Sequence, residues 1–193
     1  MGLISNGVTT FDNGSYNIGG SMVLVSSATA SASASVEFTL GDYKEYKFYF
    51  VNMHTSNDTG RFQFQGNVVG GSGFNETMVS TYFGAKHNQA GSYSTLAYAT
   101  AYDNVGTGFT LFEEGGNTGS SRSNSSYLHL FNPSSTTFVK HFIAVTSNAQ
   151  SDDYCTTSHI AGYFNTASAI DEIQFKMSVG NIDSGTILMY GIN

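Results

Sequence analysis

The chain is poor in the residues that carry most covalent, ionic and metal chemistry. Its 193 residues include one cysteine, one proline and no tryptophan, and only 11% of them are charged. The single Cys155 excludes an intrachain disulfide framework, and no Cys/His spacing typical of zinc is present. We therefore interpret Cys155 as a buried spectator thiol.

Basic residues are scarce as well. Seven Lys and Arg stand against fourteen Asp and Glu, which gives a formal net charge of -7. A nucleic-acid groove needs clustered basic side chains to neutralise phosphates, so we expect no nucleic-acid partner. With so little charge, the solvated faces must be built from Ser, Thr, Asn, Gln and Gly. Such a surface suits a protein that packs among other proteins.

Signals for export or membrane insertion are also missing. No basic segment followed by an apolar run opens the chain, and no apolar stretch approaches the roughly 18 residues of a membrane span. Gly2 follows Met1, but Asn6 stands where the myristoylation pattern has Ser or Thr. We therefore expect no membrane partner and a protein made and kept in a cytoplasm.

Catalytic motifs are not found. The sequence has no GxSxG, P-loop or GxGxxG pattern. Glu113 and Glu114 are adjacent, so on a strand they point to opposite faces, and we interpret them as solvated loop charges. His129 and His141 fall on neighbouring predicted strands, where a structural pair is favoured over a metal site. We expect no enzyme: no catalytic residues, no cofactor and no metal.

The chain is rich in phenylalanine and tyrosine, which make up all of its 14% aromatic content. The stretch 40–65 shows the pattern most clearly. Tyr46, Phe48 and Phe50 share one side of an extended chain, and Phe62 and Phe64 alternate with polar residues after a polar turn. The pattern predicts a hairpin that supplies core aromatic residues.

Alternation and turn residues predict ten short strands in addition to those in 40–65. They are 22–25, 34–40, 78–86, 94–101, 109–112, 127–131, 138–146, 159–164, 173–177 and 186–192. We expect 127–131 and 138–146 to form a second hairpin, 147–157 a polar loop, and 167–172 a bend or one helical turn. The Ala/Ser segment 26–33 stays open between strand and flexible linker. The strands predict an all-β fold, an antiparallel, jelly-roll-like β-sandwich in a single domain over 21–193, preceded by a short N-terminal arm, 1–20.

Contact surfaces are expected where apolar side chains occur in irregular segments. These are the glycine-broken arm and the aromatic-dotted segment 74–119, because long loops commonly carry specificity. The candidate contact residues are Leu3, Ile4, Phe11, Tyr16, Tyr82, Tyr93, Tyr98 and Tyr102.

Several strand and turn segments spread over roughly residues 20–193 are distinctive when taken together. They include YKEY at 43–46, FQFQ at 62–65, GFNET at 73–77, FNPSSTT at 131–137, VKHF at 139–142, AGYF at 161–164, AIDEIQFK at 169–176 and GNIDSGTI at 180–187. Together these segments resemble a family of small virion structural proteins encoded by tailed phages of cyanobacteria and other marine bacteria.

The resemblance implies a β-sandwich that is assembled on the virion, as a head decoration (cement) protein or as a tail or fibre component. It implies no enzyme and no cofactor. The expected partners are major capsid or tail subunits and further copies of the chain in a homo-oligomer, with assembly in the host cytoplasm and the arm reaching onto a neighbouring subunit. The alternative is a carbohydrate-binding, receptor-recognition module at a fibre tip, which would bind a host-surface glycan through loop Tyr and Asn side chains.

Overall fold

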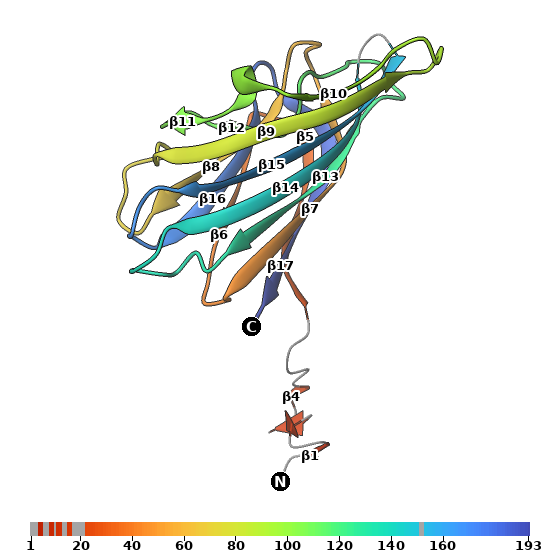
Figure 1. Ribbon diagram of the computed structural model, residues 1–193. Helices are drawn as coiled ribbons and strands as arrows, with labels where there is room; N and C mark the ends of the chain where they lie inside the picture. The colour runs from red at the N-terminus through yellow and green to blue at the C-terminus, as the bar shows by residue number, and fades with distance from the viewer. Residues whose placement is uncertain (1–3, 6–7, 10, 13–14, 17–21, 151–152) are drawn as a thin grey trace.

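The computed structural model describes residues 4–5, 8–9, 11–12, 15–16, 22–150 and 153–193. Two antiparallel sheets pack face to face, with the larger sheet in front of the smaller one in Figure 1. Between β10 and β11 lies one turn of 3-10 helix, Thr100–Tyr102. The predicted all-β, antiparallel β-sandwich is confirmed. Among the described residues, no helix has the length and apolar character needed to cross a membrane.

The larger sheet has nine strands and the smaller has four. The larger has the order β10-β9-β15-β14-β13-β7-β17-β5, with β11 also pairing with β9, and the smaller the order β12-β8-β16-β6. The bounds are β5 Val23–Ser33, β6 Ser35–Thr39, β7 Glu45–Thr55, β8 Phe62–Val68, β9 Met78–Asn88, β10 Ser94–Tyr98, β11 Val105–Gly106, β12 Thr110–Leu111, β13 Asn124–Phe131, β14 Lys140–Ala149, β15 Tyr154–Phe164, β16 Ile170–Met177 and β17 Ile182–Ile192. Upstream, β1 (Ile4–Ser5) pairs with β2 (Val8–Thr9), and β3 (Phe11–Asp12) with β4 (Ser15–Tyr16).

Eight of these strands have the connectivity of a jelly roll. If β5, β6, β7, β8, β12, β13, β16 and β17 are numbered 1 to 8 in chain order, the sheets read 1-8-3-6 and 2-7-4-5. Two insertions, β9–β11 and β14–β15, then extend the first sheet beyond β13. The jelly-roll prediction is therefore confirmed, and the insertions give the molecule one wide sheet.

The predicted hairpin at 40–65 is wrong, although its core residues are right. β7 and β8 belong to different sheets, and Phe50 and Phe62 face each other across the core with ring centroids 5.0 Å apart. Both strands carry buried aromatic residues in alternation, a pattern that fits two strands paired side by side equally well. In the structure the segment 56–61 crosses from one sheet to the other, so β7 and β8 do not pair.

The second hairpin is confirmed as β13 and β14, but β14 and β15 run further than the sequence predicted. β14 continues to Ala149 and β15 begins at Tyr154, so most of the expected loop 147–157 is strand. Asn148, Thr156 and Ser158 are buried there, and Asn148 Nδ2 donates to the Gly115 carbonyl. A polar interior thus lets hydroxyl and amide residues occupy the inward positions of strands.

The open Ala/Ser segment is strand. β5 runs to Ser33 and pairs with β17, and the chain changes sheets at Ala34, so the two halves of the alternating run lie in different sheets. Ala32 next to this crossing has a φ of 49°. At the other ambiguous segment, 167–172, Ile170 already begins β16, which excludes a helical turn over its last three residues.

Gly162 on β15 tests how closely the inserted strands pack. A Cβ there would clash with the Val79 carbonyl oxygen of β9 and lie 2.7 Å from a ring carbon of Phe142. We expect Gly162→Ala to lower the free energy of unfolding by about 1–3 kcal/mol in chemical denaturation, because backbone atoms must separate. Gly108→Ala is the control, since its nearest neighbour would lie 3.8 Å away. Equal losses in both variants would contradict the close packing.

Candidate assembly surface

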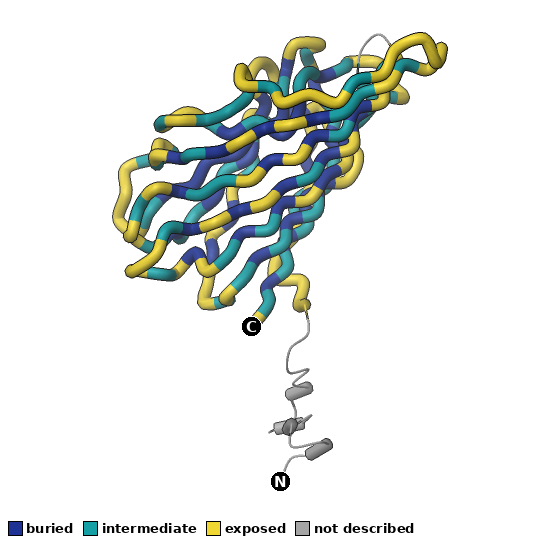
Figure 2. The backbone as a smooth tube through the Cα atoms, in the orientation of Figure 1, coloured by how far each residue is buried: buried dark blue, intermediate teal, exposed yellow. Residues whose placement is uncertain are grey.

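The outward side of the nine-stranded sheet, here called the outer face, carries large side chains in one row across seven strands. Along β9, β15, β14 and β13 buried and more exposed residues alternate, as Figure 2 shows, so the inward set packs on the core and the outward set faces solvent. Direct cross-strand partners define the row, here called the central ridge: Leu188, Tyr49, Tyr127, Val145, His159, Phe83 and Tyr98.

Ring contacts hold the central ridge against the sheet. Phe83 and His159 stack with centroids 5.0 Å apart, and Tyr49 lies 6.5 Å from Tyr127 and 5.7 Å from Tyr190. Phe83 is nevertheless 44% exposed and Tyr127 39%. Single exposed apolar residues are ordinary, whereas a contiguous apolar row is typical of an interaction site.

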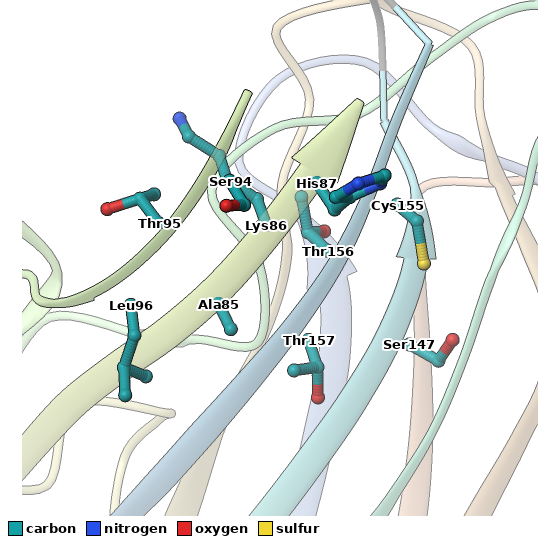
Figure 3. Close-up of a pocket in the computed structure, with 10 residues that line it drawn as sticks. All are labelled: Ala85, Lys86, His87, Ser94, Thr95, Leu96, Ser147, Cys155, Thr156 and Thr157. Carbon is teal, nitrogen blue, oxygen red and sulfur yellow. The ribbon is translucent and has the colours of Figure 1, made fainter. Parts of the chain in front are cut away.

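A groove of about 680 Å³ runs beside the ridge (Figure 3). Its floor is the next row of cross-strand partners, Leu96, Ala85, Thr157 and Ser147, which point to the same side. Three of these four side chains are small, and they lie next to the bulky residues of the ridge. We call this depression the floor groove. Its end is formed by His87 and Cys155, and Cys155 is exposed, so the predicted burial of the thiol is wrong.

On the other side of the ridge the outer face has a second hollow of about 480 Å³. Thr81 and Ala161 are direct cross-strand partners there, and Ile143 pairs with Ala161 on the next strand. Ile143 is 46% exposed. The outer face is therefore corrugated, with a raised row between two lower ones.

Charge is sparse on the outer face. In the ridge and the rows next to it, Lys47 is the charged side chain, and Glu45 lies one row further along β7. Glu45 Oε2 lies 2.7 Å from His129 Nε2. His141 contacts Tyr163 instead, with ring centroids 5.8 Å apart, so the two histidines serve separate contacts. Within the described part of the chain, no group of three or more His, Cys, Asp or Glu is placed to hold a metal ion.

Two of the four tyrosines predicted as contact residues in 74–119 are not open surface. Tyr82 is completely buried, with its hydroxyl hydrogen-bonded to Ser158. Burial raises the pKa of this hydroxyl. Tyr102 is partly buried against the core, 5.1 Å from the Tyr82 ring and 5.3 Å from the Arg61 guanidinium. The prediction is wrong for Tyr82, because its position on β9 points inward.

The other two tyrosines are exposed. Tyr98, at 56% exposure, belongs to the central ridge, and its hydroxyl donates to Asp103 Oδ2 at 2.7 Å. The hydrogen bond with Asp103 raises the pKa of the Tyr98 hydroxyl. Tyr93 is 44% exposed and packs edge-on against Tyr154.

Of the candidate arm residues, Leu3 lies outside the described residues. Ile4, Phe11 and Tyr16 lie in the short ladders β1–β2 and β3–β4, which the structure describes as backbone pairings: Ile4 with Thr9, and Phe11 with Tyr16.

The interpretation of Glu113 as a solvated charge is wrong. Its side chain is 2% exposed, accepts hydrogen bonds from the Phe62 N–H at 3.0 Å and Asn124 Nδ2 at 2.6 Å, and joins the crossing segment after β12 to both sheets. Burial raises the pKa of the Glu113 carboxyl to about 7, although the two hydrogen bonds and the nearby Arg61 charge act in the opposite direction. Glu114 lies 3.7 Å from Lys86 Nζ in an ion pair.

The central ridge was not predicted, yet a signal for it exists in the sequence. In β7 and β14 both alternating positions are apolar. In β7, Phe48 and Phe50 point into the core while Tyr49 and Val51 point outward. In β14, Phe142 points into the core while Ile143 and Val145 point outward. A strand at the surface of a sandwich needs apolar residues on one face only. Apolar residues on both faces therefore indicate a second covered or contacting surface.

Comparison with known proteins finds no matching family model and no matching curated protein. Among solved structures, a chain from "Structure of infectious bursal disease virus Gx strain" matches with 14% sequence identity and a TM-score of 0.17. The match covers 86% of this chain and spans 40% of that chain. At this TM-score the likeness carries no argument about the present chain.

Proposed function

We propose that the chain is a non-enzymatic structural protein of a tailed-phage virion that assembles through protein–protein contacts. It would act as a capsid decoration or cement protein, or as a tail or fibre component, and would be localised in the virion after assembly in the host cytoplasm. The observation that carries the proposal is the outer face, where apolar and aromatic side chains cross seven strands with little charge between them.

Two further features support an assembly role. Jelly rolls are a common architecture of viral capsid domains, although lectins and enzymes share it, so the fold by itself sets no function. The strand and turn segments that resemble phage virion proteins lie within the sandwich, including 139–142 on its inserted hairpin. An apolar, weakly charged sheet face is well suited to repeated contacts with neighbouring subunits.

Particle composition tests the proposal. Quantitative mass spectrometry of purified virions should detect the chain, and antibody labelling of the particles should place it on the head or the tail. Hundreds of copies per particle would indicate a capsid decoration protein, whereas a few or a few dozen would indicate a tail or fibre component. Absence from purified, infectious particles would refute a virion role.

The N-terminal arm gives a separate prediction. We expect a chain that begins at Met22 to retain the melting temperature of the full chain, because the sandwich core is built from residue 28 onward. We expect the same chain to be incorporated into particles less well, since residues 1–20 are proposed to reach a neighbouring subunit. Incorporation can be compared in virions grown with either version. Equal incorporation would contradict this role of the arm.

A second candidate function is carbohydrate binding at a fibre tip. The floor groove favours it, because its volume lies in the range of ligand sites and hydroxyl side chains of Ser94, Ser147 and Thr157 line it. A glycan array carrying host-surface sugars tests this function, and no binding to any of them would count against it.

A further inference from the structure

We infer that the outer face is the interface between two copies of this chain, related by a two-fold axis. The inference rests on the proposed assembly function and names the partner of the same surface. Each copy would place its central ridge in the floor groove of the other.

Shape is the first argument for a second copy. The ridge and the floor groove run side by side across the strands, because they are adjacent rows of cross-strand partners. A two-fold axis that runs parallel to both rows and between them brings each ridge onto the partner's groove. In such an isologous interface one patch is complementary to itself, so a single corrugated face supplies both halves.

Sheet geometry is the second argument. Sheets that pack face to face do so with their strands about 30° apart, an angle that arises from the common right-handed twist. Two copies of one sheet have the same twist, so they can pack face to face at this angle. With this axis, Phe83, His159 and Val145 on one copy would face the small side chains of Ala85, Thr157 and Ser147 on the other.

The available area fits a stable dimer. The floor groove, the central ridge, the row of the second hollow and the row of Glu45 make four outward rows, which lie about 6.7 Å apart. Across seven strands about 4.8 Å apart, they give a footprint of roughly 600 Å² per copy. Specific stable interfaces bury about 1,200–2,000 Å² in total, so two such footprints reach the lower end of this range. Non-specific crystal contacts are commonly smaller than this, with less than about 800 Å² buried in total.

Charge is the third argument. Two copies with a net charge of -7 repel each other, and the repulsion is weakest where a face carries no acidic side chains. Among the residues that the structure describes, Glu45 is the one acidic side chain in the four outward rows, and it is already paired with His129. The outer face is therefore a surface on which identical copies can approach.

Sedimentation velocity on the full chain tests the inference across micromolar concentrations. We expect a dimer for the native sequence. Phe83→Lys puts a charge on the ridge and Thr157→Arg fills the floor groove, and each should raise the dimer Kd at least about 100-fold, because each change occurs twice in the interface. Val69→Lys, at a residue that is 62% exposed outside the outer face, should leave the Kd unchanged. Thermal melting confirms that the variants fold.

Three results would overturn the inference. They are a native chain that stays monomeric at the highest concentration, ridge and groove variants that dimerise like the native chain, and a dimer that is lost when residues 1–21 are removed but not in Phe83→Lys. The last result would mean that the N-terminal arm, and not the outer face, joins the two copies. If the chain is monomeric but present in virions, the dimer is refuted and the virion role stands. If the chain is dimeric but absent from virions, the virion role is refuted and the dimer stands.

Discussion

Phe50→Ala is expected to lower the free energy of unfolding by about 3–5 kcal/mol. Phe50 is 1% exposed and lies where the two sheets meet. Its ring centroid is 5.0 Å from that of Phe62, 5.2 Å from Phe112 and 4.9 Å from Phe175, each in an edge-to-face arrangement. Truncation removes these contacts and leaves a cavity, because the backbones of two sheets cannot close around one missing ring.

Chemical denaturation measures this loss, and Phe138→Ala is the matched control. Phe138 is 69% exposed, so the same truncation there should cost less than about 0.5 kcal/mol. Similar losses at both positions would show that Phe50 is not the link between the sheets. Because the lost contacts join β7 to β8, to β16 and to Phe112 just after β12, the variant should weaken the whole sandwich rather than one edge of it.

The buried Glu113 carboxyl should make folding stability depend on pH. Burial raises its pKa from 4.5 to about 7, so the folded protein binds a proton over a range in which the unfolded chain does not. Proton binding by Glu113 therefore stabilises the folded state fully below pH 4.5. This stabilisation falls as the pH rises toward 7, and stability no longer changes with the Glu113 carboxyl above that pH. The fall amounts to about 3 kcal/mol if the full shift is expressed.

Glu113→Gln isolates this dependence. Glutamine keeps the size of the side chain, and its carbonyl can accept from the Phe62 N–H. Asn124 can turn its amide to accept from the new NH2 group, because the Ser126 hydroxyl that now donates to Asn124 Oδ1 can also accept a hydrogen bond. Urea denaturation of both proteins from pH 4 to pH 8 gives the free energy of unfolding at each pH, and the two curves are then compared.

Comparing the two proteins removes the contribution of other acids. Asp58 acts in the opposite direction, because hydrogen bonds from the Thr118 hydroxyl and N–H lower the pKa of its carboxyl. We expect stability of the native protein to decline from pH 4.5 to 7 relative to Glu113→Gln. Parallel curves for the two proteins would show that Glu113 is ionised in the folded state throughout.

Alternation in the sequence predicted the all-β class and the second hairpin because both depend on local pattern and a short turn. Tyr127–Phe131 and the strand that follows them are joined by a turn that contains Pro133, and such a connection leaves antiparallel neighbours as the simplest outcome. At 40–65 the same reasoning failed. Alternation along a strand indicates which side is buried but not which sheet the strand belongs to. In a sandwich, consecutive strands can lie in different sheets.

The candidate contact residues show the same limit. Tyr93 and Tyr98 are exposed and Tyr82 is buried, although all three occur in one glycine-rich, aromatic segment. Tyr82 lies inward because β9 pairs in a register that places Phe83 outward beside His159. A shift by one residue would exchange the two. That register is set by β15, more than 70 residues away in the chain.

By itself the amino-acid sequence determined that the chain forms strands, that phenylalanine builds the core, and that charged residues are few and mostly acidic. These properties follow from composition and from a period of two, which are local. Tertiary structure alone decided that β7 and β8 face each other across the core, that Glu113 is buried, and that Tyr49, Tyr127, Val145, His159 and Phe83 form one ridge. Each of these depends on pairing between distant strands, because only the register of neighbouring strands brings such residues side by side.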